Sequence, residues 1–194
     1  MTGAPTTAVP GSRRRAGNAM GRARAAILLG ARQALAESGP RGLTMSRVAD
    51  RGGVAKATVY NHFRDRRELI DGVALDLVER VLAAGEDAED LASALAVIAG
   101  VAAGLPEIRG AVEHDPSVVA LAIVPVDSPA WNAARVQVTG LLARHGAPEP
   151  DVAAGWVMRW LVAVAAAAPD ATTVSAEADL TAAGVLAGAP VAGR

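Results

Sequence analysis

LTMSRVADRGGVAKATVYNHFRDRREL, residues 43–69, predicts two short helices joined by a tight turn and followed by the start of a third helix. Thr44 is a favourable N-cap for the first of them, which is expected to end near Arg51. Gly52 and Gly53 then supply a backbone that can adopt positive φ in the turn. Two short helices at this spacing are the geometry of a helix-turn-helix unit, in which the first helix braces the second against DNA.

The second short helix, expected over 56–63, has one apolar and one polar face. Val59 and Phe63, at i and i+4, point inward together. The opposite face carries hydrogen-bond donors and amphipathic rings, namely Lys56, Thr58, Tyr60, Asn61 and His62. Because a helix is narrow enough to enter the DNA major groove, this face predicts contact with DNA. Taken singly, Tyr60 and His62 are also compatible with simple packing between helices.

The flanking elements are predicted from capping and breaking residues. A first helix is expected over 20–38 and ends before Pro40, because proline cannot continue it. Asp65 and Glu68 have the spacing of a capping box, so a longer helix is expected over 66–84.

The charge of the chain is divided unequally between its halves. Residues 1–67 hold 13 Lys and Arg against 3 Asp and Glu, whereas residues 68–194 hold 6 against 17, although the net charge is only −1. This asymmetry indicates one end that binds a polyanion and another that serves solubility or partner binding. Five arginines near the N-terminus would form either a DNA-contacting arm or a solvated tail: Arg13, Arg14, Arg15, Arg22 and Arg24.

The N-terminal residues 1–18 are rich in Thr, Pro, Gly and Arg and are expected to be a disordered basic arm. The residues after them superficially resemble a twin-arginine export signal. Arg32 interrupts their apolar stretch, however, and the apolar residues recur at helical spacing, which favours an amphipathic helix. Translation could begin at Met1 or at Met20.

A set of apolar, glycine and polar positions recurs at fixed spacing through residues 23–72: Ile27, Leu28, Ala31, Leu35, Leu43, Thr44, Val48, Ala49, Gly53, Val54, Thr58, Val59, Tyr60, His62, Phe63, Glu68 and Leu69. This segment, about a quarter of the chain, resembles the DNA-binding domain of the TetR family of bacterial transcriptional regulators. Two positions depart from the family pattern, since Ala55 stands where serine often caps the recognition helix and Ala57 where glycine is frequent. The missing cap costs about 1 kcal/mol, so this helix is expected to fray until DNA orders it.

The resemblance implies a role for each polar position of the unit. Lys56, Ala57 and Asn61 would reach base edges, where lysine approaches guanine acceptors and alanine touches a thymine methyl group. Phosphates would be contacted by Thr44, Thr58, Tyr60, His62 and Arg66, with Ser46 and Arg47 near the backbone or the groove edge. Phosphate contacts supply most of the affinity, and base contacts supply the sequence preference.

The second half of the chain has the Ala, Leu and Val content of a helical bundle. Helices are expected over 89–103, 107–113, 117–123, 130–144, 151–167 and 175–186, separated by segments that contain proline or glycine. The expected fold class is therefore all-α. A three-helix helix-turn-helix domain over 19–66 would precede a helical ligand-binding and dimerisation domain over 67–194, and the helix over 66–84 would connect the two.

The resemblance also implies that this second domain dimerises through its last two long helices and binds a small molecule. Small residues at helical spacing permit close helix approach, so the dimer-interface candidates are Gly155, Ala163 and Ala167, with Trp160. Trp156 and Trp160 at i and i+4 are more typical of a core or a dimer interface than of a pocket wall. Any pocket is expected to be apolar and modest in size. The residues expected to orient a ligand in it are Arg109, Glu113, His114, Asp127, Trp131, Arg135, Trp156 and Arg159.

Other kinds of site have no signal in the sequence. The chain has no cysteine, and three adjacent residues such as Glu113 to Asp115 cannot converge from one helical turn, so neither a metal nor a cofactor is expected. No nucleophile–base pair and no phosphate-binding glycine loop supports an enzyme. The most apolar run, 161–168, is far shorter than the about 20 residues that span a membrane, which with the lack of cysteine favours the cytoplasm.

The sequence therefore predicts a homodimeric regulator that binds a double-stranded DNA operator, most simply a repressor released by a small apolar ligand. Two alternatives remain, a DNA-binding protein whose helical bundle only dimerises and, less favoured, an enzyme. No motif specifies the operator sequence, the effector, the regulated genes, or whether binding represses or activates.

Overall fold

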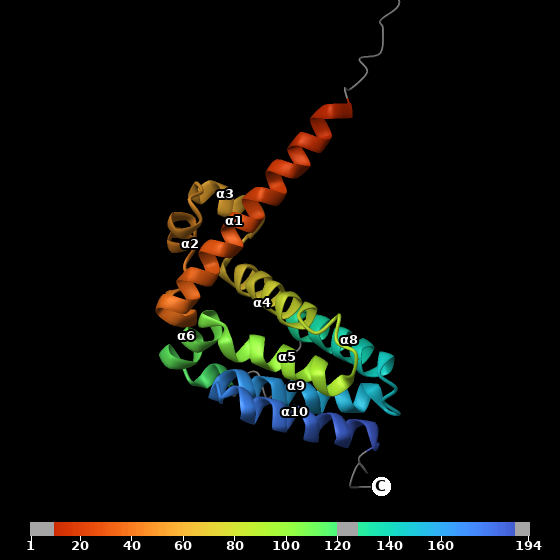
Figure 1. Ribbon diagram of the computed structural model, residues 1–194. Coiled ribbons are helices and arrows are strands. Elements are labelled where there is room, and N and C mark those ends of the chain that lie inside the picture. Colours follow the sequence, from red (N-terminus) through yellow and green to blue (C-terminus); the bar gives the residue numbers. More distant parts are fainter. Residues whose placement is uncertain (1–9, 120–127, 189–194) are drawn as a thin grey trace, which may run out of the picture.

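The computed structural model describes residues 10–119 and 128–188, and every element in these residues is a helix (Figure 1). The helices are α1 (Pro10–Gly42), α2 (Met45–Gly52), α3 (Lys56–His62), α4 (Arg66–Ala83), α5 (Leu91–Gly104), α6 (Pro106–His114), α8 (Pro129–Arg144), α9 (Pro150–Ala167) and α10 (Ala171–Leu186). Residues 117–119 are also helical, and the rest of the helix expected over 117–123 lies outside the described residues. The all-α prediction is confirmed.

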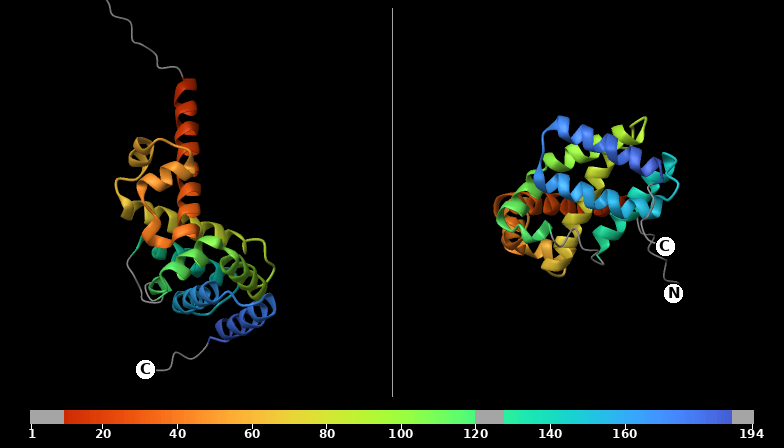
Figure 2. Two further views of the ribbon diagram at one scale, coloured as in Figure 1. Left: turned by 90° about the vertical axis from the view of Figure 1, so that its left-hand side faces the viewer. Right: turned by 90° about the horizontal axis from the view of Figure 1, so that it is seen from below.

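The first helix differs from its expected extent at both ends. α1 begins at Pro10 rather than near Met20, so residues 10–18, expected to be a disordered arm, are helical. Its N-terminal part projects beyond the rest of the molecule (Figures 1 and 2). Near its C-terminal end the helix breaks at Gly39, whose φ of 61° and ψ of −172° are far from helical values. The break falls at the expected place because glycine alone adopts that backbone without strain.

A small core holds α1, α2, α3 and the start of α4 together. Ile27, Val48, Val59 and Phe63 are almost completely buried in it. The residues predicted to point inward from the two short helices therefore do so. Fully burying side chains of this kind contributes about 1.5–3 kcal/mol each.

The crossing of α1 and α2 depends on two glycines. A Cβ atom on Gly30 would lie 2.7 Å from the carbonyl oxygen of Val48, and one on Gly52 would lie 2.7 Å from the carbonyl oxygen of Ala26. Real Cβ atoms do not approach backbone that closely, so only glycine permits this crossing. Gly52 was predicted for its freedom in the turn, but here its lack of a side chain is what the packing requires.

The larger core lies in the second half of the chain. Its central helix is α5, whose residues Leu91, Leu95 and Ile98 are almost fully buried. It packs against α10, α9 and α4, while α8 packs against α4 and α9. α10 begins four residues before the expected start at residue 175, because the Asp170 side chain caps it by accepting a hydrogen bond of 2.9 Å from the backbone N–H of Thr173.

Helix α6 joins this bundle to α1 over an extended contact (Figure 1). A Cβ atom on Gly110 would lie 2.7 Å from the backbone Cα and carbonyl carbon of Ala36, so the two helices meet backbone to backbone. At the end of the contact, Arg41 lies 3.6 Å from the carboxylate of Asp115.

A charged network joins α1, α4 and α6 beside this contact. Arg32 pairs with Asp76, and its Nε lies 3.4 Å from Oε1 of Glu107. Arg80 reaches the same oxygen at 3.3 Å. Glu107 is only 6% exposed, so breaking the network would leave a buried charge without its partners.

Among the described residues, no single helix has the length and hydropathy to cross a membrane. The pair α5 and α6 passes that test together by length and composition, although it is bent by 56° at the break.

Candidate nucleic-acid interface and effector cleft

The turn between α2 and α3 is closed by capping bonds that the sequence predicts. The hydroxyl of Thr44 accepts a hydrogen bond of 3.3 Å from the backbone N–H of Arg47 at the start of α2. At the other end Gly53 adopts a left-handed conformation, with φ 62° and ψ 31°, and donates its N–H to the carbonyl of Ala49. Val54 donates to the same carbonyl at 3.0 Å. These bonds satisfy the helix-terminal carbonyls and direct the chain into α3.

Helix α3 presents its polar face to solvent because its apolar side is buried in the small core. Val59 is fully buried and Phe63 is 2% exposed. Lys56, Ala57 and Asn61 are exposed on the other side. Tyr60 is 48% exposed, and the Lys56 amine lies 6.0 Å from the centroid of its ring. This cation–π contact holds two potential DNA-contacting groups together.

The remaining predicted DNA contacts differ in how far they are exposed. Thr58 and His62 are half-buried at the edges of the exposed face of α3. Ser46 and Arg47 are exposed on α2. Their roles towards DNA stay predictions, as do those of the whole set.

Two arginines of the predicted DNA-binding set, Arg66 and Arg47, are already engaged within the protein. Arg66 donates from Nε to the carbonyl of Leu43 at 2.9 Å and from Nη2 to the carbonyl of Pro40. Arg47 donates to the Ser38 hydroxyl. Both side chains brace the connection between α1 and α2. A guanidinium has five donors, so these bonds leave N–H groups for phosphate.

The start of α3 lacks a cap, as the sequence predicts. Ala55 has the extended backbone of an N-cap residue, with φ −66° and ψ 144°, but no side-chain hydrogen bond reaches the first turn. By contrast, α2 and α4 both have side-chain caps. The weakest helix end in the helix-turn-helix unit is thus that of the helix predicted to read DNA.

Of the two hydrogen bonds in the predicted capping box at the start of α4, only the one accepted by Asp65 forms. The Asp65 carboxylate accepts from the backbone N–H of Glu68 at 2.9 Å. The Glu68 carboxylate, however, accepts from the backbone N–H of Arg64, at 2.8 Å, and from the Arg64 side chain at 3.1 Å. The Arg64 N–H and guanidinium lower the pKa of Glu68 below its ordinary value.

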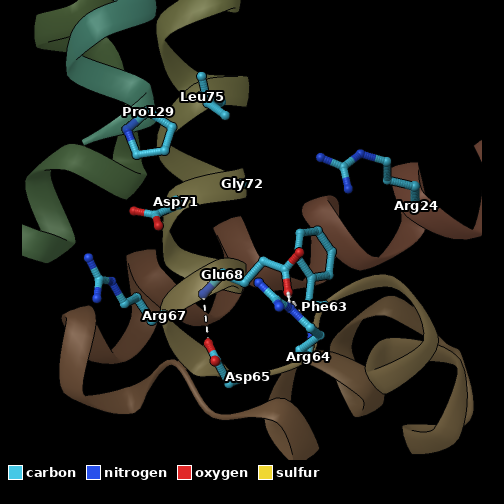
Figure 3. Close-up of a pocket in the computed structure, with 10 residues that line it drawn as sticks. All are labelled: Arg24, Phe63, Arg64, Asp65, Arg67, Glu68, Asp71, Gly72, Leu75 and Pro129. Carbon is cyan, nitrogen blue, oxygen red and sulfur yellow. Dashed lines mark hydrogen bonds and ion pairs between the residues drawn. The ribbon is translucent and has the colours of Figure 1, made fainter. Parts of the chain in front are cut away.

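Below α3 the same residues border a charged cleft of about 510 Å³ (Figure 3). Arg24 of α1 lies over the ring of Phe63, 4.9 Å from its centroid. Phe63 in turn contacts α4 at Gly72, where a Cβ atom would lie 2.6 Å from Cε1 of the ring. The sequence suggests Arg24 only for a basic arm, and nothing in its local pattern indicates the contact with the Phe63 ring.

A second cleft of about 510 Å³ lies among α4, α8 and α9, with single residues from α5 and α6. Its described lining is almost entirely apolar and includes Leu77, Val81, Val138 and Leu161, with Trp131 at the side of α8. The volume falls in the range of small-molecule sites, and such sites are mostly apolar with a few polar groups. The cleft is therefore the candidate effector site.

Most of the residues predicted to orient a ligand do not line this cleft. Trp131 does. Arg109, Glu113, His114, Arg135 and Arg159 are exposed on other faces of their helices, and Asp127 lies outside the described residues. These five residues are absent from the cleft because Ala, Leu and Val fill the inward helix faces, and their role towards a ligand stays a prediction. The Nδ1 atom of His114 instead lies 2.8 Å from the carbonyl oxygen of Gly110 in the same helix.

The predicted dimer-interface residues lie on the outer side of the bundle, where α9 and α10 run side by side (Figure 2). Ala163 and Ala167 are exposed, and Gly155 is half-buried. Trp160 packs inward and donates from Nε1 to the Glu177 carboxylate at 3.0 Å. Trp156, predicted for the pocket, is instead 42% exposed on α9 and lies against Gly184 of α10.

Comparisons with known proteins agree with the resemblance of the helix-turn-helix segment. Residues 27–73 match the sequence model for bacterial regulatory proteins of the tetR family. The comparison with curated proteins gave no match.

Two solved structures with similar folds were found among others. The TetR family repressor AlkX from Dietzia sp. strain DQ12-45-1b is 21% identical, with a TM-score of 0.62 over 84% of this chain and 94% of that one. A transcriptional regulator from Rhodococcus sp. Rha1 is 23% identical, with a TM-score of 0.56 over 90% of this chain and 99% of that one. At these identities the likeness concerns the fold alone. The family match covers residues 27–73 and assigns this helix-turn-helix segment to the DNA-binding domain of TetR-family transcriptional regulators.

Proposed function

We propose that this regulator is a homodimeric repressor that leaves its operator when a small, largely apolar ligand binds. The observation that carries the DNA-binding part is the exposed polar face of α3, held outward by the buried Val59 and Phe63. Direct readout needs such a face, since base edges in the major groove are recognised by side-chain donors and methyl groups.

Within this face we assign the sequence preference to Lys56, Ala57 and Asn61 and the general affinity to the residues around them. Asparagine can bond adenine through two hydrogen bonds, and lysine can donate to guanine. Tyr60 and Thr58 would contact phosphates, together with Thr44, Ser46, Arg47, His62 and Arg66. The excess of positive charge in residues 1–67 supports this division, because phosphate contacts depend on it.

Dimerisation would use α9 and α10. Large apolar side chains that are poorly covered within one chain occur on both helices, namely Val152, Trp156, Leu180 and Leu186. Gly155, Ala163 and Ala167 are small enough to let a partner helix approach. A dimer would present two copies of α3 to successive major grooves, which predicts a near-palindromic operator with half-sites about 34–36 Å apart or a multiple of it.

Release by a ligand is supported by the position of the apolar cleft. Helix α4 lines the cleft with Leu77 and Val81, and the same helix contacts Phe63 of the DNA-binding unit at Gly72. A ligand that prefers one arrangement of α4 would therefore change the spacing of the two α3 helices, provided that its affinity for the two arrangements differs. We propose that the protein acts in the cytoplasm.

Selection of bound fragments from genomic DNA tests the proposal and would identify the operator. On the selected operator, affinity should fall by ~10³-fold or more between 50 and 200 mM salt if several phosphates are neutralised. Flat salt dependence, or absence of any enriched site, would contradict operator binding.

Two substitutions on the same face of α3 separate base readout from phosphate contact. Asn61→Ala should relax the preference at one base position, with a loss of about 1–3 kcal/mol of discrimination there. Tyr60→Ala should weaken binding to all sequences about equally. If Asn61→Ala left the selected site unchanged, its assignment to base readout would be wrong.

A further inference from the structure

The apolar cleft contains one ionisable side chain in its described lining, that of Asp71 on α4. The other polar groups there are the Ser128 hydroxyl and the Trp131 indole N–H. The Ser128 hydroxyl accepts a hydrogen bond of 3.1 Å from the backbone N–H of Trp131 as the cap of α8 and keeps its O–H as a neutral donor. Asp71 is therefore the one group in this described lining that can offer a full charge to a ligand.

Asp71 makes no hydrogen bond or ion pair with any other described residue. Its neighbour one turn earlier, Arg67, points to the same side of α4 (Figure 3), yet no ion pair joins the two. Asp71 is half-buried beside apolar walls, and a carboxylate in such a place costs desolvation free energy unless a partner offsets it. A cationic partner would therefore stabilise the Asp71 carboxylate.

The position of Asp71 also sets it apart from the other carboxylates of the chain. It lines the charged cleft below α3, where Figure 3 shows it, and it also lines the apolar cleft. Near it, Pro129 lines the charged cleft and Ser128 and Ala130 line the apolar one, at the N-terminal end of α8. Gly72, the next residue, contacts the Phe63 ring. A group bound to Asp71 would thus lie beside the contact that connects α4 to the recognition helix.

We propose that the effector is a cationic amphiphile, an apolar body that carries an ammonium group, and that Asp71 is its counter-ion. This inference rests on the proposed ligand-responsive function and names the chemical class of the ligand. The apolar walls bury the body, and the positive charge of the ammonium lies against the Asp71 carboxylate in an electrostatic contact. An anionic amphiphile would place two negative charges together in a poorly solvated cleft, which disfavours it.

Three probes with the same apolar tail test the class of ligand: decyltrimethylammonium, decanol and decanoate. Each is titrated calorimetrically into the full chain without DNA, at pH 7 and low salt. The expected result is one site per chain that binds the cation at least about tenfold more tightly than decanol or decanoate, which corresponds to about 1.4 kcal/mol. Equal or tighter binding of decanoate, equal binding of decanol, or no binding of the cation overturns the proposal.

Two substitutions at Asp71, with a charge-matched control at Asp87, test the role of Asp71. Asp71→Asn should weaken decyltrimethylammonium about tenfold and leave decanol unchanged, and Asp71→Lys should shift the preference to decanoate. Asp87→Asn removes the same charge at an exposed position outside the cleft and should have no effect. If Asp71→Asn and Asp87→Asn weaken the cation equally, the attraction is general and the proposal is wrong.

Trp131 locates the bound molecule. The cation should change tryptophan fluorescence in the wild-type chain, and Trp131→Phe should abolish that change while the calorimetric binding persists. A fluorescence change that survives in Trp131→Phe would place the molecule elsewhere and overturn the proposal. Thermal melting of each variant without ligand shows whether a loss of binding reflects a loss of fold.

Measurements of probe binding and of operator affinity distinguish a failure of this inference from a failure of the proposed function. If the cation binds through Asp71 but leaves operator affinity unchanged, the ligand class is right and release by that ligand is wrong. If decanoate rather than the cation binds and releases the operator, the regulator is ligand-responsive and the assignment of Asp71 is wrong.

Discussion

Helix α3, which carries the predicted base contacts, is fixed to the protein by two buried side chains, Val59 and Phe63, and begins without a cap at Ala55. An uncapped first turn leaves several backbone N–H groups without an acceptor. Seven residues are also too few for a helix to be stable on its own. The stability of α3 therefore depends on its two buried side chains and, in the complex, on DNA.

Ala55→Ser tests this dependence. The serine hydroxyl would accept from the N–H groups of the first turn, so the free energy of unfolding should rise by about 1 kcal/mol. Urea denaturation measures the change. Operator affinity should also rise, because less order remains to be gained on binding.

Ala57→Ser, in the same helix, is the control for stability. A serine at position 57 does not occupy a capping position. Its lower helix propensity should reduce stability by about 0.5 kcal/mol. If the two variants had the same stability, Ala55 would not act as the N-cap.

At the scale of the element, several helices begin at capping side chains whose charge depends on pH. The Asp170 carboxylate caps α10, and the N–H of Thr173 followed by its hydroxyl holds the pKa of Asp170 below the ordinary value of 3.8. Asp90 caps α5 in the same way through Ser93, with its pKa also lowered. Because the folded-state pKa is lowered, the ionised form stabilises the fold. That contribution is complete well above 3.8 and is lost as the pH falls through the lowered value.

Asp170→Asn should therefore make stability less sensitive to acid. Asparagine caps a helix without titrating, so the decrease in stability between about pH 5 and pH 2 should become shallower. The helix signal in circular dichroism, at about 222 nm, is followed during acid titration, and its decrease with pH is compared between the variant and the wild type. Asp179→Asn, in the same helix but away from its first turn, should keep the wild-type slope.

The contact between α1 and α6 depends on the absence of a side chain at Gly110. Gly110→Ala would bring Cβ within 2.7 Å of the backbone of Ala36, so one helix must move. Overpacking of this kind costs about 1–3 kcal/mol of stability. Gly140→Ala in α8 meets nothing within 4 Å and should be neutral or stabilise by up to about 1 kcal/mol. Urea denaturation of both variants compares them directly, and equal stabilities would contradict the close contact.

At the scale of the whole molecule, α9 and α10 together carry several large apolar side chains that one chain leaves exposed. Leu180 on α10 is 74% exposed, and Val152 and Trp156 on α9 are also largely open to solvent. Adjacent exposed apolar residues on two neighbouring helices are typical of a protein interface. The basic end of the molecule and this surface are separated, which suits a dimer that holds two DNA-binding units towards one duplex.

Leu180→Glu should convert the proposed dimer to a monomer, since a carboxylate buried at the interface would lack a partner. Val136→Glu is the matched control, because Val136 is 72% exposed on α8 and lies outside the α9 and α10 surface. Sedimentation velocity distinguishes the two species. If both variants remain dimeric, or if both dissociate, α9 and α10 are not the specific interface.

The sequence by itself determined the helix-turn-helix unit. Thr44, Gly53 and Asp65 act through bonds to residues within a few positions, so their spacing is sufficient to predict α2, the turn and the start of α4. The same holds for the uncapped Ala55. Local hydrogen bonds of this kind do not depend on how the distant helices pack.

Only the tertiary structure decided which residues line the apolar cleft. Helices α4, α8 and α9 contribute most of its walls, and they are joined by long segments of chain. Their alanine-rich sequences have apolar residues on several faces, so the periodicity does not define how each helix is rotated about its axis. For that reason Trp156 and Arg159 were predicted for a pocket that they do not line, whereas Asp71 was found only when α4, α8 and α9 were brought together.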